Sequence, residues 1–222
     1  MFDQITAMAR GLVAVLALAG SPTAAQEGGT DCGNWLSPTF FESAVLAEVL
    51  VCRARSGAGA RNPAGETALH LAAVYSNDPL ILPALLLMSE QVEARTAEGE
   101  TPLHMAARLG TNAAAVVHLA NANADVDAGV SERCRWLPGT RCRGTTALHL
   151  AAERADGIDM VAALILAEAD VEALDDRDRT PLHSAAAAGG SALSLDLLIR
   201  AGADVSAEDR HGWTPLHMTA LT

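Results

Sequence analysis

The sequence predicts an all-α solenoid, in which short helices stack into one elongated core, and three observations support this fold class. A motif, Thr-x-Leu-His followed by small and apolar residues, begins at Thr67, Thr101, Thr146, Thr180 and Thr214. The steps between these threonines are 34, 45, 34 and 34 residues, and such a period is typical of repeats that contact only their neighbours. Proline follows the threonine in three copies, where a first helical turn tolerates it because the missing N–H would have no partner. Aromatic residues make up only 3% of the chain, which suits the close packing of short helices.

The repeated motif resembles the signature of the ankyrin repeat, which includes Thr-Pro-Leu-His-x-Ala. The copy at 101–106, Thr-Pro-Leu-His-Met-Ala, matches it at every fixed position. The resemblance covers about residues 38–222. It implies paired antiparallel helices with projecting β-turn fingers, and a family that binds proteins through its fingers and the concave face of its first helices.

Residues 1–25 have the parts of an export signal. Arg10 ends a short polar segment, residues 11–19 form an apolar run, and 23–25 offer small side chains for cleavage before Gln26. The apolar run is far shorter than the ~20 residues that span a bilayer. We therefore predict a cleaved signal peptide, no integral membrane segment after cleavage, and export to the periplasm or out of the cell. With the motif copies, this makes the chain similar to exported ankyrin proteins of Gram-negative bacteria.

A polar lead at 26–37 precedes the repeat domain, which we place at 38–222. Ser37-Pro38 predicts a helix start, and 38–66 is interpreted as a degenerate first repeat that caps the stack. Full repeats then start near 67, 101, 146 and 180, and a partial one starts at 214.

Two helix ends and one helix start depart from the family pattern, which the ending at Gly202 matches best. Gly202 follows the second helix of the repeat that starts near 180 and can adopt positive φ there. Asn123 has the equivalent position in the repeat that starts near 101 and also tolerates positive φ. Glu168 in that place predicts strain or a different ending. Pro83 falls inside the second helix of the first full repeat, so we expect that helix to start or kink there.

The last motif copy has room for one helix before Thr222. A one-helix unit leaves an apolar face open, and solenoids normally carry a polar terminal cap. We expect a monomer whose sequence is incomplete here, or a chain capped at this end by a partner or a second copy.

Four cysteines in an exported chain predict two disulfides with three possible pairings. Sequence proximity favours Cys32–Cys52 and Cys134–Cys142. Zinc is the competing use, but the spacings do not supply paired Cys-x-x-Cys ligands.

The 45-residue step places an insertion of 11 residues (45 minus 34) within 129–145, at one finger. Trp and Arg are enriched at binding hot spots, and a disulfide-closed loop would lose little entropy on docking. The insertion is therefore the best candidate for a protein-binding site, through Arg133, Arg135, Trp136, Leu137, Arg141 and Arg143. In an alternative interpretation Trp136 folds back as a lid while the arginines pair with Asp125 and Asp127.

Other fingers supply further candidates by position. They are Thr96, Glu98, Glu100, Arg177, Arg179, Arg210, His211 and Trp213. Several aspartates near the fingers can cap turns through bonds from side chain to backbone. The 12-residue calcium-loop spacing is absent from the sequence.

Five of the seven histidines belong to the motif. We expect each imidazole to bond the motif threonine and the backbone of the adjoining turn, which fixes the helix start. Repeats stack 8–10 Å apart, whereas two nitrogens on one metal lie within about 4 Å, so the ladder cannot share a metal. The structural pairs are Thr67 and His70, Thr101 and His104, Thr146 and His149, Thr180 and His183, and Thr214 and His217.

The formal net charge of −12 argues against nucleic acid and anionic lipid as partners. The sequence contains no Gly-x-Ser-x-Gly, phosphate-binding Gly loop or His-Glu-x-x-His. We therefore predict a non-enzymatic scaffold without cofactor that binds a protein partner. The alternatives are an exported inhibitor or protective factor for one enzyme, and an enzyme or metal protein built on the solenoid.

Overall fold

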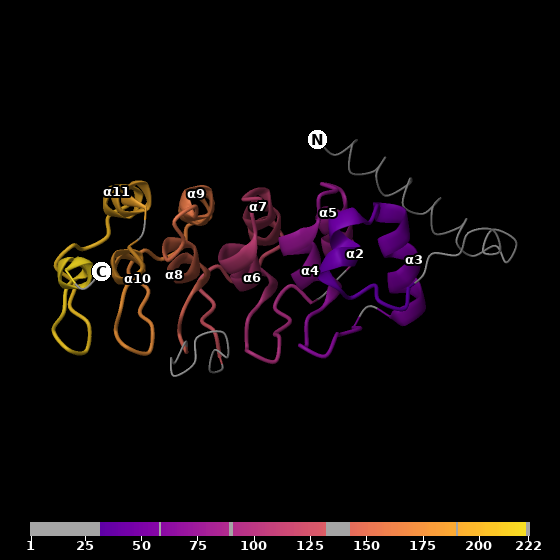
Figure 1. Ribbon diagram of the computed structural model, residues 1–222, viewed down its shortest axis with the longest axis horizontal. Helices are drawn as coiled ribbons and strands as arrows, with labels where there is room; N and C mark the ends of the chain where they lie inside the picture. The colour runs from indigo at the N-terminus through magenta and orange to yellow at the C-terminus, as the bar shows by residue number, and fades with distance from the viewer. Residues whose placement is uncertain (1–31, 58, 89–90, 132–142, 190, 221–222) are drawn as a thin grey trace, which may run out of the picture.

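The computed structural model describes residues 32–57, 59–88, 91–131, 143–189 and 191–220 (Figure 1). Its helices follow one another along an elongated stack. In chain order they are α2 (Pro38–Ser43), α3 (Leu46–Ser56), α4 (Ala68–Tyr75), α5 (Ile81–Met88), α6 (Pro102–Leu109), α7 (Ala114–Asn121), α8 (Ala147–Ala152), α9 (Ile158–Leu166), α10 (Pro181–Ala187), α11 (Ala192–Arg200) and α12 (Pro215–Thr219).

The helices form two parallel rows. The first row contains α2, α4, α6, α8, α10 and α12, and the second contains α3, α5, α7, α9 and α11; each helix packs on the next of its row. Figure 1 shows the fingers projecting from the first row, on the side away from the second. The described residues form no strand, so the predicted all-α solenoid is confirmed.

The core runs along the whole stack between the two rows. Its largest buried side chains include Phe41 at one end, Leu103 and Leu148 in the middle, and Leu198 near the other end. Because these positions recur with the repeat, each helix pair buries its apolar face only against its neighbours. Among the described residues, no helix is both long and apolar enough to span a bilayer.

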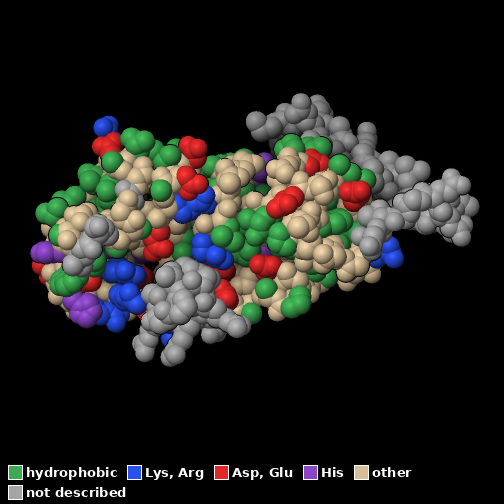
Figure 2. Space-filling model, in the orientation of Figure 1, with side chains coloured by type: hydrophobic (Ala, Val, Ile, Leu, Met, Phe, Trp, Pro, Cys, Tyr) green, Lys and Arg blue, Asp and Glu red, His purple; other side chains and the backbone are tan. Residues whose placement is uncertain are grey.

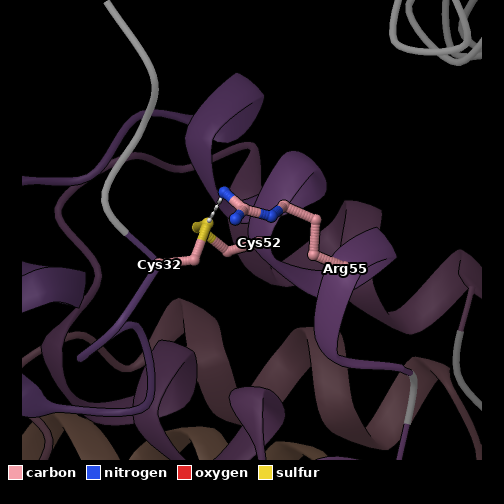
Figure 3. The surroundings of a disulfide bond; sticks show 3 residues. All are labelled: Cys32, Cys52 and Arg55. Atoms are coloured by element: carbon pink, nitrogen blue, oxygen red, sulfur yellow. Dashed lines mark hydrogen bonds between the residues drawn. A yellow bond between two sulfur atoms is a disulfide. The ribbon is translucent and has the colours of Figure 1, made fainter. Parts of the chain in front are cut away.

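A disulfide ties the segment before α2 to helix α3. Cys32 and Cys52 are bonded, with Cα atoms 5.3 Å apart, and the Nη1 atom of Arg55 donates to Cys32 Sγ at 3.6 Å (Figure 3). The predicted pairing is thus confirmed for this bond. Its 20-residue separation corresponds to about 3 kcal/mol of chain entropy. Cys134 and Cys142 lie outside the described residues.

The helix starts follow the residues that precede them. Ser37 accepts a bond from the N–H of Phe40, with Pro38 in the first turn, as the sequence predicted. Helix α5 corrects the expectation for Pro83, because it begins two residues earlier, at Ile81. Pro83 then occupies the third position of the helix, still within the first turn, where its missing N–H interrupts no helical hydrogen bond.

Three second helices end in the same way despite different residues at the turn. Asn123, Glu168 and Gly202 have φ values of 62°, 65° and 105°. In each case the N–H of the next residue donates to a carbonyl five residues earlier, at 3.0 Å. Glu168 therefore keeps the common ending and carries the strain, since left-handed backbone costs a residue with a Cβ about 1–2 kcal/mol.

Replacing Glu168 by glycine is expected to raise the free energy of unfolding by about 1 kcal/mol. The Glu168 side chain is exposed and has no hydrogen bond or ion pair with the described residues, so little else is lost. The matched control is Gly202→Ala, where an added Cβ would meet nothing within 4 Å, and which should lower stability through backbone strain alone. Urea unfolding measures both; a destabilised Glu168→Gly protein would contradict this account.

Candidate functional site

Four of the fingers are tight turns, each held by one polar side chain at its base. The Oδ1 atom of Asp175 accepts from the N–H groups of Arg177 and Arg179, at 2.7 and 3.0 Å. Asp209 makes the equivalent bonds to His211 and Trp213. Asn62 and Thr96 do the same in the earlier repeats. The sequence-based expectation that aspartates cap these turns is confirmed for Asp175 and Asp209.

Neighbouring fingers are joined through their backbones. The N–H of Asp176 donates to the carbonyl of Arg143 at 2.9 Å, and that of Arg210 to the carbonyl of Arg177 at 3.1 Å. Ala97 bonds Ala64 in the same way. These bonds place successive finger tips in one row, so several fingers can contact one partner together.

The motif histidines connect each repeat to the next. Nδ1 lies 2.7–3.0 Å from the threonine Oγ1 in all five copies, and it also accepts from the threonine N–H. In four copies Nε2 lies 2.9–3.2 Å from a carbonyl at the end of the following finger. The predicted structural role of these residues is confirmed: the carbonyls belong to Glu100, Thr145, Arg179 and Trp213.

These contacts require neutral imidazoles. Because a backbone N–H donates to Nδ1, the proton must sit on Nε2, which donates to the carbonyl. Burial lowers the pKa of His70 and of His104 to about 4, although the carbonyl bonds oppose the shift. Burial also lowers the pKa of His149. The four histidines that also bond the following finger therefore hold the stack together.

The predicted protein-binding residues of the insertion and of the C-terminal fingers divide into three groups. Arg133, Arg135, Trp136, Leu137 and Arg141 lie outside the described residues. Arg143, Arg210 and His211 are exposed at finger tips, and Trp213 is 42% exposed. Figure 2 shows Arg side chains gathered over the fingers of the C-terminal repeats.

Arg177 and Arg179 form the third group, and they are less accessible. Arg177 is half-buried. The guanidinium of Arg179 donates to Asp175 Oδ2 at 2.8 and 3.0 Å, and only 16% of its side chain is exposed. Burial alone would raise the pKa of Asp175, but the bonds from Arg179 outweigh it and lower the pKa. Arg179 thus stabilises its own finger.

A hollow of about 280 Å³ lies beside the fingers of the first two full repeats, where Glu66, Glu98 and Arg108 help to line it; we call it the finger groove. Arg108 makes a bidentate ion pair with the buried Glu100, at 2.7 and 2.8 Å. In this repeat the residue seven positions after the motif threonine, Arg108, therefore lines the finger groove.

In the next repeat that position holds Glu153, which the sequence analysis missed. Its carboxylate accepts from Ser184 Oγ at 3.4 Å, and the residue is half-buried. Aligning the repeats on their threonines would have shown a Glu where the preceding repeat has an Arg. This position of the repeat thus changes charge from one repeat to the next.

The described residues hold no group of three or more His, Cys, Asp or Glu side chains that could bind a metal ion. Their carboxylates are spread along the fingers and loops, mostly as caps of turns. What the described surface offers is therefore a row of fingers above a polar groove.

Comparison with known proteins agrees with this geometry. A family model described as ankyrin repeats (3 copies) matches residues 23–130, 85–175 and 148–222. A search of curated proteins found no match. The matched segments overlap and together cover most of the sequence. The chain therefore belongs to the ankyrin-repeat proteins, whose repeats are protein–protein interaction modules.

Proposed function

We propose that this protein is an exported, non-enzymatic binding module of the bacterial cell envelope, which holds a protein partner through its fingers and the finger groove. The proposal rests on the observation that the polar side chains fall into two sets, one bonded inside the stack and one exposed at the finger tips. The motif threonines and histidines of the first four copies are buried and bonded within the stack, whereas the finger tips present Arg143, Arg210, His211 and Trp213. A partner can therefore be recognised at the fingers without disturbing the fold.

We assign the partner an acidic patch that the insertion at 129–145 contacts. Trp136 and Arg135 are the anchors in this proposal, because such residues carry most of the energy at interface hot spots. The nearby finger arginines, Arg143 and Arg210, extend the same basic character. The 1–25 segment and the paired cysteines support the placement outside the cytoplasm.

The test is affinity capture from periplasmic extract with three baits. The first is the mature chain, the second has 129–145 replaced by a short turn, and the third carries Arg200→Ala as a control, since Arg200 pairs with Asp196 on the second row, away from the fingers. A partner held by the first and third baits only would place binding at the insertion. Equal capture by all three would remove the insertion from the site.

With a captured partner, Trp136→Ala and Arg135→Ala are each expected to weaken affinity by about thirtyfold or more if they are hot-spot anchors. Unchanged affinities would end the proposed role of these two residues. Export is tested separately, by cell fractionation and by sequencing the N-terminus of the mature chain, which should begin at Gln26.

A further inference from the structure

The carboxylate of Glu153 occupies the position that Arg108 has in the preceding repeat, and in the repeat order it lies between two ion pairs. On one side Arg108 is bonded bidentately to Glu100. On the other, Arg179 is bonded to Asp175 through both its Nε and Nη2 atoms. Glu153 lies between them in the repeat order, and no ion pair joins it to any described residue.

Glu153 is half-buried, and its carboxylate is only weakly hydrogen-bonded to the described residues. Its single side-chain hydrogen bond is the 3.4 Å contact from Ser184 Oγ, which is long for a bond to a carboxylate. Burial raises the pKa of Glu153, although the positive charge of Arg179 and the Ser184 hydroxyl oppose the shift, and Asp175 adds to it. Because Glu153 is only half-buried, a cation of a partner can reach this carboxylate and would stabilise it.

Ser184 is unusual at the same point. Four residues after the motif threonine, the other copies have the larger apolar residues Leu71, Met105, Leu150 and Met218. Ser184 is 2% exposed, and its hydroxyl faces Glu153. A small polar residue thus replaces a large apolar one beside the unpaired carboxylate, and both changes occur only in this pair of repeats.

We propose that Glu153, supported by Ser184, receives a basic side chain, Arg or Lys, of the protein partner. The inference rests on the proposed binding function and specifies its chemistry: the partner offers acidic groups to the finger tips and one cation to Glu153. Such an ion pair is partly desolvated, so it contributes more to the choice of partner than to affinity. A partner with a neutral residue at this place would leave Glu153 unpaired and would bind less well.

The experiment titrates the full chain, labelled at glutamate carboxyl carbons, with the peptide acetyl-Gly-Arg-Gly-amide and is followed by NMR. The matched peptide has citrulline in place of arginine, which keeps the shape and removes the charge. We expect a saturable shift of the Glu153 Cδ resonance with the arginine peptide and about tenfold weaker binding of the citrulline peptide. Higher salt should weaken the first titration.

Two variants complete the design. In Glu153→Gln the backbone amide of Ser184 should no longer respond to the arginine peptide. In Glu168→Gln, which changes an exposed glutamate at the end of a second-row helix, the response should persist. Glu153→Gln should also unfold at the same or higher urea concentration than the parent, because no ion pair among the described residues is lost.

Three results would overturn the inference. One is a Glu153 resonance that does not respond to the arginine peptide, or responds equally to citrulline. Another is a lower unfolding midpoint for Glu153→Gln, which would make Glu153 a stabilising residue of the stack. The third is a Glu153 resonance that moves when Arg135 and Arg141 are changed to glutamine, since the insertion would then be its partner. The affinity capture tests the proposed function separately. If the parent bait captures a partner, the proposed function stands even when one of these results is found. If no bait captures a partner, the proposed function is wrong.

Discussion

Lowering the pH from 7 to 4 is expected to destabilise the repeat stack by several kcal/mol through its buried histidines. His70 and His104 have folded-state pKa values of about 4, against an ordinary value of 6.5. A shift of this size corresponds to about 3 kcal/mol for each residue. His149 adds to the effect in the same direction, because burial lowers its pKa as well.

The direction follows from where the protons bind. Between pH 6.5 and 4 the unfolded chain protonates these histidines while the folded chain does not, so stability falls as the pH falls. The contribution is complete above pH 6.5 and is lost by about pH 4. Asp175 and Asp209 act at lower pH, because bonds from the backbone outweigh burial and hold their pKa values below the usual 3.8.

Urea unfolding at pH 7, 5.5 and 4.5, followed by circular dichroism, measures the effect. Stability that stays level between pH 7 and 5, and falls only below pH 4, would show that the carboxylates and not the histidines set the acid limit. Adding 0.5 M salt distinguishes general charge effects, because buried groups are screened far less than exposed ones.

His104→Ala is expected to lower the free energy of unfolding by about 3–5 kcal/mol. The imidazole is 1% exposed. Its removal leaves a cavity and takes the partner from the Thr101 N–H, from the Thr101 hydroxyl and from the Thr145 carbonyl. Urea unfolding at pH 7 measures the loss.

The chain contains its own control in His217. This residue is exposed and bonds Thr214 through Nδ1, but no described carbonyl accepts from its Nε2. His217→Ala should therefore cost less than about 1 kcal/mol. Similar losses for the two variants would show that the threonine contact alone matters, and that the bond between repeats contributes nothing.

Much of the functional surface could be placed from sequence because the repeat fixes where each residue lies. Counting from the motif threonines correctly placed Arg143, Arg210, His211 and Trp213 at the fingers. The same counting offered Arg179 as a binding residue. It could not show that Asp175 accepts hydrogen bonds from the Arg179 guanidinium. Glu153 was missed for a related reason: a glutamate at a helix end looks like a solvated charge until its neighbours are known.

The sequence by itself determined the solenoid, the rows of helices and the histidine ladder. Each depends on a local pattern repeated five times, and each repeat needs only its immediate neighbours to fold. Tertiary structure decided the rest. It placed the start of α5 at Ile81, because a proline is compatible with any position in the first turn. It gave Glu168 the same helix ending as Gly202, because the stack repays about 1–2 kcal/mol of backbone strain. It also showed that Arg108 and Arg179 form ion pairs whereas Glu153 forms none with the described residues. Such pairing depends on distances in the folded stack, which the sequence pattern does not give.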